Sequence, residues 1–277
     1  MGKSTGDAMM LSVIICTSGK RERELGLLME DIKTQNFPDH EVVLIKGVFP
    51  VGRARNLGIR KAMADIVLFL DDDARIDDPA LFRKFFNACS RDQYSVFGAG
   101  RLGGNRLNFF QRLILTFIPR ELIPPVTADT PSDLIATMCM GGQKRIFEGT
   151  PFDERITAGE DTKFRSAIRK KGFTTVLLAN SYICHPPRKN IEDLIIQRIW
   201  YGRGISQLRF RGKKAPLPVK IGLIFYLALR FFFMPVHSFL PNLNSFIRKE
   251  EPLKPRFNPF YAFFDLFYAY GYVSNAV

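Results

Sequence analysis

The chain has few of the residues that mark disulfide-rich or zinc-binding proteins. Its 4 Cys residues stand far apart, with no Cys-x-x-Cys pair among them. This excludes the usual spacing of a zinc site and gives no sign of a small disulfide framework. No secretory leader is visible ahead of the first cysteine, so we expect buried, reduced thiols in a cytoplasmic setting.

Long uninterrupted apolar runs are also missing. Two apolar stretches, 219–240 and 259–273, carry part of an aromatic load of 26 Phe against 1 Trp. The first stretch is interrupted by Arg230 and Pro235, and the second by Asp265. A membrane-spanning helix needs about 20 predominantly apolar residues, so neither stretch is a clean spanning helix.

What the sequence does contain is an alternation of strand and helix patterns. Strand-like apolar runs alternate with helix-like periodicity, which is typical of an α/β fold with a mostly parallel sheet. Uninterrupted apolar strands are expected where helices cover both faces of such a sheet. The predicted strands are 11–16, 41–45, 66–70 and 175–178, with a further strand and a glycine-rich turn within 95–104, and the predicted helices are 25–32, 53–64 and 161–171.

Composition changes near residue 210, where charged residues, Gly and Pro combine as in a linker. We therefore predict a flexible leader at 1–10, a catalytic domain at 11–210 and a basic, aromatic-rich helical region at 211–277. Most of the net charge of +13 lies in 188–256. Positive charge of this size attracts any polyanion, whether nucleic acid, anionic lipid or nucleotide diphosphate.

Three consecutive carboxylates, Asp71–Asp73, directly follow the apolar run 66–70. Adjacent like charges are costly unless a cation neutralises them, and Mg²⁺ or Mn²⁺ is usually held by one or two carboxylates together with substrate phosphates. The cluster thus indicates a site for a divalent ion and a diphosphate. The structural alternative is a turn that caps a helix beginning near Pro79.

Four segments, in order along the chain, resemble the family 2 glycosyltransferases. Residues 12–17 resemble the family's opening strand, and 51–59 contain its Gly-x-x-x-Arg-Asn-x-Gly helix. Residues 69–73 fit its Asp-x-Asp motif, and 151–161 fit its Phe-Asp-Glu and Gly-Glu-Asp signature. The resemblance implies the GT-A nucleotide-diphospho-sugar transferase fold and inverting transfer that depends on Mg²⁺ or Mn²⁺ and a nucleotide-sugar donor.

The resemblance also implies roles for individual residues. An inverting displacement needs one carboxylate to take the acceptor's proton, while a metal stabilises the departing nucleoside diphosphate. The base would be Asp161, with Glu160 beside it, although an acidic pair is also favoured at a helix start without any chemistry. The implied nucleotide-sugar residues are Thr17, Arg55, Asp71 and Asp72, and the implied metal ligands are Asp71 and Asp73.

Two further residues are predicted to belong to the site. His185 follows the late strand, where some enzymes of this fold place an imidazole on the metal; the alternative is a turn histidine. Arg145 follows a Gly-Gly pair and could bind the nucleotide-sugar or the acceptor, or be a solvated arginine.

The chain departs from the family pattern at two places. Ile45 is followed by Lys46, where the family usually has an acidic residue that contacts the nucleobase. Processive relatives carry Gln-x-x-Arg-Trp, whereas this chain has a different sequence at 197–204. The donor base therefore stays open, and we expect a non-processive enzyme.

The tail is predicted to associate with a membrane. An amphipathic stripe at 109–118 joins the two aromatic stretches, and basic residues flank them, a combination typical of helices in an anionic membrane interface. We expect a protein on the cytoplasmic side of the cell membrane, peripheral or shallowly inserted, acting on a lipid-linked acceptor. The alternatives are a hairpin that dips into the bilayer, with Arg230 and Asp265 paired, and homo-oligomerisation.

Two other functions compete with this interpretation. A nucleotidyltransferase would share the fold, but the glycine- and lysine-rich loop expected after its first strand is replaced by the poor match at 17–21. A basic nucleic-acid-binding protein would stack bases on Trp200, Tyr201 and Phe210. No nucleic-acid motif supports it, and we expect no nucleic-acid partner.

Overall fold

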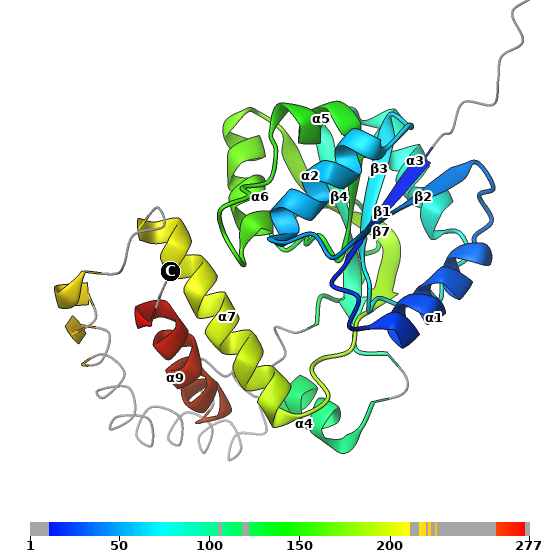
Figure 1. Cartoon of the computed structure of the whole chain (residues 1–277). Helices are drawn as coiled ribbons and strands as arrows, with labels where there is room; N and C mark the ends of the chain where they lie inside the picture. Colours follow the sequence, from blue (N-terminus) through cyan, green and yellow to red (C-terminus); the bar gives the residue numbers. More distant parts are fainter. Residues whose placement is uncertain are drawn as a thin grey trace, which may run out of the picture. The chain divides into compact units, whose positions relative to one another are not determined.

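A computed structural model describes residues 11–104, 107–117, 122–210, 216–219, 221–222, 225 and 259–274. Among these residues, seven strands form one sheet in the order β2-β1-β3-β6-β4-β7-β5 (Figure 1). The strands are β1 (Leu11–Thr17), β2 (His40–Lys46), β3 (Ile66–Asp71), β4 (Ser95–Leu102), β5 (Thr130–Pro131), β6 (Cys139–Gln143) and β7 (Thr174–Cys184).

The sheet is mostly parallel, as predicted. Strand β1 runs parallel to both β2 and β3, and β4 runs parallel to β7. Strand β6 lies antiparallel between β3 and β4, and β5 is antiparallel to β7. Because parallel strands end at the same edge of a sheet, the ends of β1, β3 and β7 all lie on one side.

Helices cover both faces of this sheet. Alternate residues of β1 face opposite sides, so Val13 joins the apolar cluster under α1 and α3, whereas Ile14 joins the cluster under α2, α5 and α6. These helices are α1 (Glu22–Lys33), α2 (Val51–Lys61), α3 (Leu81–Arg91), α5 (Lys144–Gly149) and α6 (Glu160–Lys170).

Phenylalanine fills the cluster beneath α5 and α6. The rings of Phe147 and Phe164 stack with centroids 5.1 Å apart, and those of Phe152 and Phe164 with centroids 4.7 Å apart. Phe69 of β3 meets Phe147 edge-on at 5.2 Å. Offset and edge-on aromatic pairs add to the free energy gained by burial, so part of the high Phe content belongs to the core.

The chain divides into two compact units. The first comprises Met1–Leu107 and Arg120–Pro187, and the second comprises Asn108–Pro119 and Arg188–Val277. In the second unit, Ile114 of α4 (Phe109–Phe117), Leu194 of α7 (Ile191–Phe210) and Phe264 of α9 (Pro259–Val273) form a small apolar cluster.

The two units do not follow the predicted domain limits. The predicted catalytic domain, 11–210, includes α7, whereas the contacts group α7 with α4 and α9. The predicted leader and residues 226–258 lie outside the described residues. Within the part of the chain that the structure describes, no helix has both the length and the hydropathy needed to cross a membrane.

Candidate active site

The site lies at the edge of the sheet where β1, β3 and β7 end. Asp71 is the last residue of β3, and the chain then turns toward the end of β7, where the backbones of Arg75 and Cys184 exchange hydrogen bonds of 2.8 and 2.9 Å. The His185 amide donates to the Leu102 carbonyl oxygen at 2.8 Å. These backbone bonds carry His185 to the acidic cluster although β6 and β4 separate β7 from β3.

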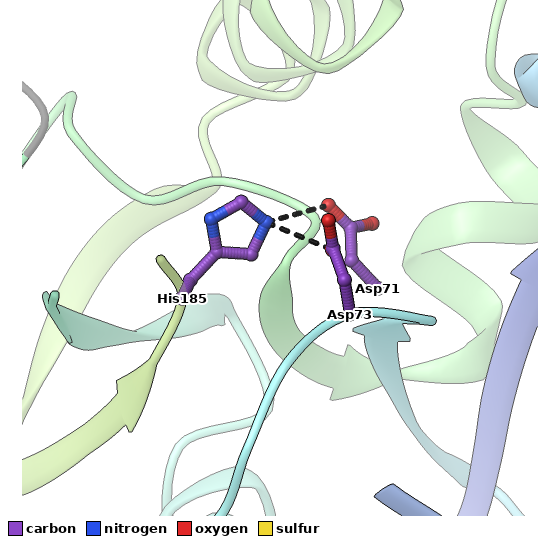
Figure 2. Close-up of side chains that lie close together, drawn as sticks. All are labelled: Asp71, Asp73 and His185. Atoms are coloured by element: carbon purple, nitrogen blue, oxygen red, sulfur yellow. Dashed lines mark ion pairs between the residues drawn. The ribbon is translucent and has the colours of Figure 1, made fainter. Parts of the chain in front are cut away.

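Asp71, Asp73 and His185 form a cluster suited to a metal ion (Figure 2). The His185 Nε2 atom lies 3.0 Å from Asp73 Oδ1 and 3.9 Å from Asp71 Oδ2. One ligand atom from each residue lies within 4.8 Å of the other two. Two carboxylates and an imidazole suit a divalent ion such as Mn²⁺, which accepts oxygen and nitrogen ligands. The structure thus brings together the three predicted metal ligands, and their role stays a prediction.

The carboxylates also change the acid–base behaviour of His185. Burial by itself would lower the pKa of this imidazole, but the negative charges of Asp73 and Asp71 outweigh it and raise the pKa above its usual value. A negative environment that favours a cationic imidazole favours a metal cation for the same reason.

Asp72 is not part of this cluster, but it shares Arg21 with Asp73 and so connects the cluster to the loop after β1. Its Oδ1 atom lies 3.0 Å from Arg21 Nη1, and its side chain also bonds to that of Thr17. The Thr17 hydroxyl oxygen in turn accepts a hydrogen bond from the Gly19 amide at 3.0 Å. Burial raises the pKa of Asp72, opposed by Thr17 and Arg21. Thr17 and Asp72, both predicted to bind the nucleotide, therefore hold the loop after β1 next to the acidic cluster.

Arg21 is a site residue that the sequence analysis missed. Its Nη1 atom contacts Asp73 Oδ2 at 2.5 Å as well as Asp72. No motif marks it, because a single arginine just before a helix is common at protein surfaces. The available signal was its position beyond the end of a strand next to the one that carries the acidic cluster.

Arg55 joins the acidic cluster to the start of α6. Its guanidinium is buried, forms an ion pair with Glu160, and lies 3.4 Å from Asp71 Oδ1. Burial raises the pKa of Glu160, while the charge of Arg55 opposes the shift. Burial by itself would lower the pKa of Arg55, but Glu160 and Asp71 raise it overall. Glu160, predicted to be catalytic, is thus occupied in holding Arg55.

Asp161 differs from its neighbour in exposure. Its side chain is 23% exposed, and its Oδ2 atom lies 3.1 Å from Arg165 one turn along α6. Its Oδ1 atom accepts a hydrogen bond from the Thr162 amide at 2.7 Å. Of the two predicted catalytic carboxylates, Asp161 is the more exposed, since the Glu160 side chain is only 7% exposed.

The Gly-x-x-x-Arg-Asn-x-Gly segment, which lies within α2, binds the Phe-Asp-Glu segment, and we call this contact the clamp. Asn56 Nδ2 donates to the Phe152 carbonyl oxygen and to Glu154 Oε1, and its Oδ1 accepts from the Phe152 amide, each at 2.9 Å. Gly52 and Gly58 leave no room for a Cβ atom against Asp153 and Ile14. The motif thereby fixes the segment that leads into Glu160.

Arg145 lies at the opposite edge of the sheet, so the structure does not bring it to the acidic cluster, and its contact with the nucleotide-sugar stays a prediction. Strand β6 is antiparallel to β3, so its end at Gln143 pairs with Ile66, the first residue of β3. Arg145 donates to the Gln93 carbonyl oxygen at 3.2 Å and lies over the ring of Tyr94. Arg145 lies there because an antiparallel strand carries the residues that follow it away from the edge that holds the acidic cluster.

Lys46 stands where the family usually has an acidic residue that contacts the nucleobase. Lys46 ends β2, and its Nζ atom pairs with Glu22 at 2.9 Å, with both side chains exposed. Lys46 is thus paired with Glu22 of α1, the helix that follows β1.

Comparisons with known proteins agree with this geometry. Residues 49–150 match the family model for glycosyl transferase family 2. The comparison with curated proteins found no match. A mannosyltransferase from Pyrobaculum calidifontis, solved with GDP-Man and Mn²⁺, superposes with a TM-score of 0.55 at 14% identity, covering 96% of this chain and 86% of that one.

Two other solved structures are similar over part of their length. GalNAc-T7, solved with UDP, GalNAc and Mn²⁺, gives a TM-score of 0.50 at 12% identity, covering 72% of this chain and 51% of that one. TarS from S. aureus gives 0.46 at 13% identity, covering 70% of this chain. This chain spans only 39% of the length of TarS. The likeness to the mannosyltransferase and the sheet order show that the chain has the GT-A fold, and residues 49–150 within it are similar to glycosyl transferase family 2.

Proposed function

We propose that this protein transfers one sugar, with inversion, from a nucleotide-diphosphate sugar to a hydroxyl of a membrane-held, lipid-linked acceptor. The observation that carries the proposal is the Asp71, Asp73 and His185 cluster at the active edge of a glycosyltransferase fold. Mg²⁺ or Mn²⁺ held there would stabilise the negative charge of the departing nucleoside diphosphate. Two structures with a similar fold were solved with Mn²⁺ and a nucleotide or nucleotide sugar.

Asp161 is the proposed general base. An inverting displacement needs a carboxylate that takes the proton of the acceptor hydroxyl as that oxygen attacks the sugar. Asp161 lies in the first turn of α6 with its carboxylate partly exposed, and Arg165 holds that carboxylate in position. Glu160 contributes indirectly, since its pairing with Arg55 links the start of α6 to the end of β3.

A membrane-held acceptor is supported by the second unit. Helix α9 carries a single charged residue, Asp265, and exposes three apolar or aromatic side chains at helical spacing: Phe263, Leu266 and Tyr270. A helix that is apolar on every side is normally buried on every side, so this face fits a lipid interface. The basic residues between 188 and 256 add attraction to anionic lipids. We therefore propose a location on the cytoplasmic side of the membrane.

The proposal is tested by metal-dependent donor binding. Binding of UDP and GDP would be measured by calorimetry with Mn²⁺ and with a chelator. We expect Mn²⁺ to strengthen binding of one nucleotide, and Asp73→Asn to weaken that binding by about 100-fold or more, because a ligand of the ion is lost. Asp39→Asn, a change at an exposed aspartate, is the matched control and should leave it unchanged. Equal binding after chelation would refute the metal site.

A second variant separates donor binding from transfer. Asp161→Asn should bind the nucleotide with Mn²⁺ as the wild type does, yet lose transfer by about 1000-fold or more, since an amide cannot accept the proton. Donor hydrolysis and transfer would be followed with a panel of nucleotide sugars. Full turnover in Asp161→Asn would show that another group is the base.

A further inference from the structure

Arg21 places a permanent positive charge against two members of the Asp71–Asp73 cluster. Its Nη1 atom lies 3.0 Å from Asp72 Oδ1 and 2.5 Å from Asp73 Oδ2. The other oxygen of Asp73, Oδ1, faces His185 Nε2 at 3.0 Å. The carboxylate of Asp73 therefore lies between the proposed metal position and a permanent cation.

An arginine at this position lowers the affinity of the site for a cation but stabilises the folded protein when no ion is bound. A neutral donor such as an amide could orient Asp73 equally well. A guanidinium, by contrast, is always positively charged. It therefore repels a divalent cation and partly neutralises the carboxylates that would bind that cation. The same positive charge stabilises the folded protein when no ion is bound, because it neutralises Asp72 and Asp73. Asp72 and Asp73 have side chains only 9% and 12% exposed, and buried carboxylates without a counter-charge are strongly destabilising.

We propose that the charge of Arg21 keeps the divalent-ion affinity of the free protein low, so that the ion binds tightly only together with the diphosphate of the donor. This inference rests on the proposed function. The Arg21 side chain is 33% exposed, so a bound diphosphate can approach it. The negative charge of the diphosphate then offsets the positive charge of the guanidinium. Since coupling between two ligands is reciprocal, the nucleotide also binds tightly only with the ion.

The test measures Mn²⁺ affinity by electron paramagnetic resonance of the free ion, with and without UDP or GDP. Arg21→Gln keeps a hydrogen-bond donor and removes the charge, and should raise Mn²⁺ affinity of the free protein by about tenfold or more. The increase that the nucleotide adds to Mn²⁺ affinity should shrink by a similar factor. Arg21→Lys keeps the charge and should stay within about threefold of the wild type. Arg23→Gln, at an exposed position in the first turn of α1, is the matched control.

The outcomes separate charge from geometry. If Arg21→Gln binds Mn²⁺ more weakly than the wild type or equally well, the proposal is wrong and Arg21 only orients Asp73. If Arg21→Lys behaves like Arg21→Gln, charge is again not the cause and the proposal fails. Asp73→Asn tests the metal site itself. Mn²⁺ binding that survives this change would overturn both the metal site and the role of Arg21. Circular dichroism of each variant confirms that the fold is retained.

Discussion

At the scale of single residues, Asn56 connects two parts of the site that are far apart in sequence. Its side chain is 5% exposed and makes three hydrogen bonds to residues 152–154. Two of these bonds satisfy the backbone amide and carbonyl of Phe152, which is itself buried. A buried backbone group that loses its partner costs far more than the bond contributes on average.

We therefore expect Asn56→Ala to lower the free energy of unfolding by about 2–4 kcal/mol. Urea denaturation followed by circular dichroism would measure the change. Asn36→Ala provides the control, because Asn36 is exposed and its substitution should cost no more than about 0.5 kcal/mol. Similar midpoints for the two variants would contradict the clamp.

At the scale of elements, α7 and α9 pack backbone to backbone through glycine. A Cβ atom added to Gly202 would meet the carbonyl group of Tyr268, and one added to Gly271 would meet that of Ile199. Close approach of two helices requires small residues at the crossing. Gly26 is the opposite case, since it lies within α1 with nothing close to its missing side chain.

The same substitution should thus have opposite effects at the two sites. Gly202→Ala should push α9 from α7 and reduce the hydrogen-exchange protection of the α9 amides by about tenfold or more. Gly26→Ala should instead raise the free energy of unfolding by about 0.5–1 kcal/mol, because alanine favours an exposed helix interior. Protection of α9 that is unchanged in Gly202→Ala would show that the crossing tolerates a methyl group.

At the scale of the whole molecule, net charge and exposed apolar area act together. A net charge of +13 draws the protein to any anionic surface, but this attraction falls steeply with salt. Burial of apolar side chains in a lipid interface depends little on salt. Salt dependence therefore distinguishes a membrane partner from a nucleic acid.

We expect the protein to float with anionic vesicles, and part of this binding to survive at 0.5 M salt, where the Debye length falls to about 4 Å. Replacing Phe263, Leu266 and Tyr270 with serine should remove the salt-resistant part. The control replaces three exposed residues of the other unit with serine, namely Phe49, Met63 and Tyr94. If the α9 variant still floats at high salt but changes from dimer to monomer, the face serves self-association.

Sequence by itself determined the parts of this protein that depend on local pattern. The strands at 11–16 and 66–70 and the position of Asp71 at a strand end are encoded in short apolar runs, which tertiary packing had no reason to override. The clustering of His185 with Asp73 was predicted only through the family resemblance, because the backbone bonds between residues 75 and 184 that bring it there have no local signal.

Only the tertiary structure decided the rest. Strand β6 contains Gly141 and Gly142, which have low strand propensity, and a Cβ atom on Gly141 would press against Phe85 and Val67. Packing, not propensity, therefore places this strand between β3 and β4, and its antiparallel direction puts Arg145 at the edge opposite the acidic cluster. Arg21 reaches the acidic cluster for a related reason: contacts between residues some fifty positions apart are set by the register of neighbouring strands, which no short stretch of sequence specifies.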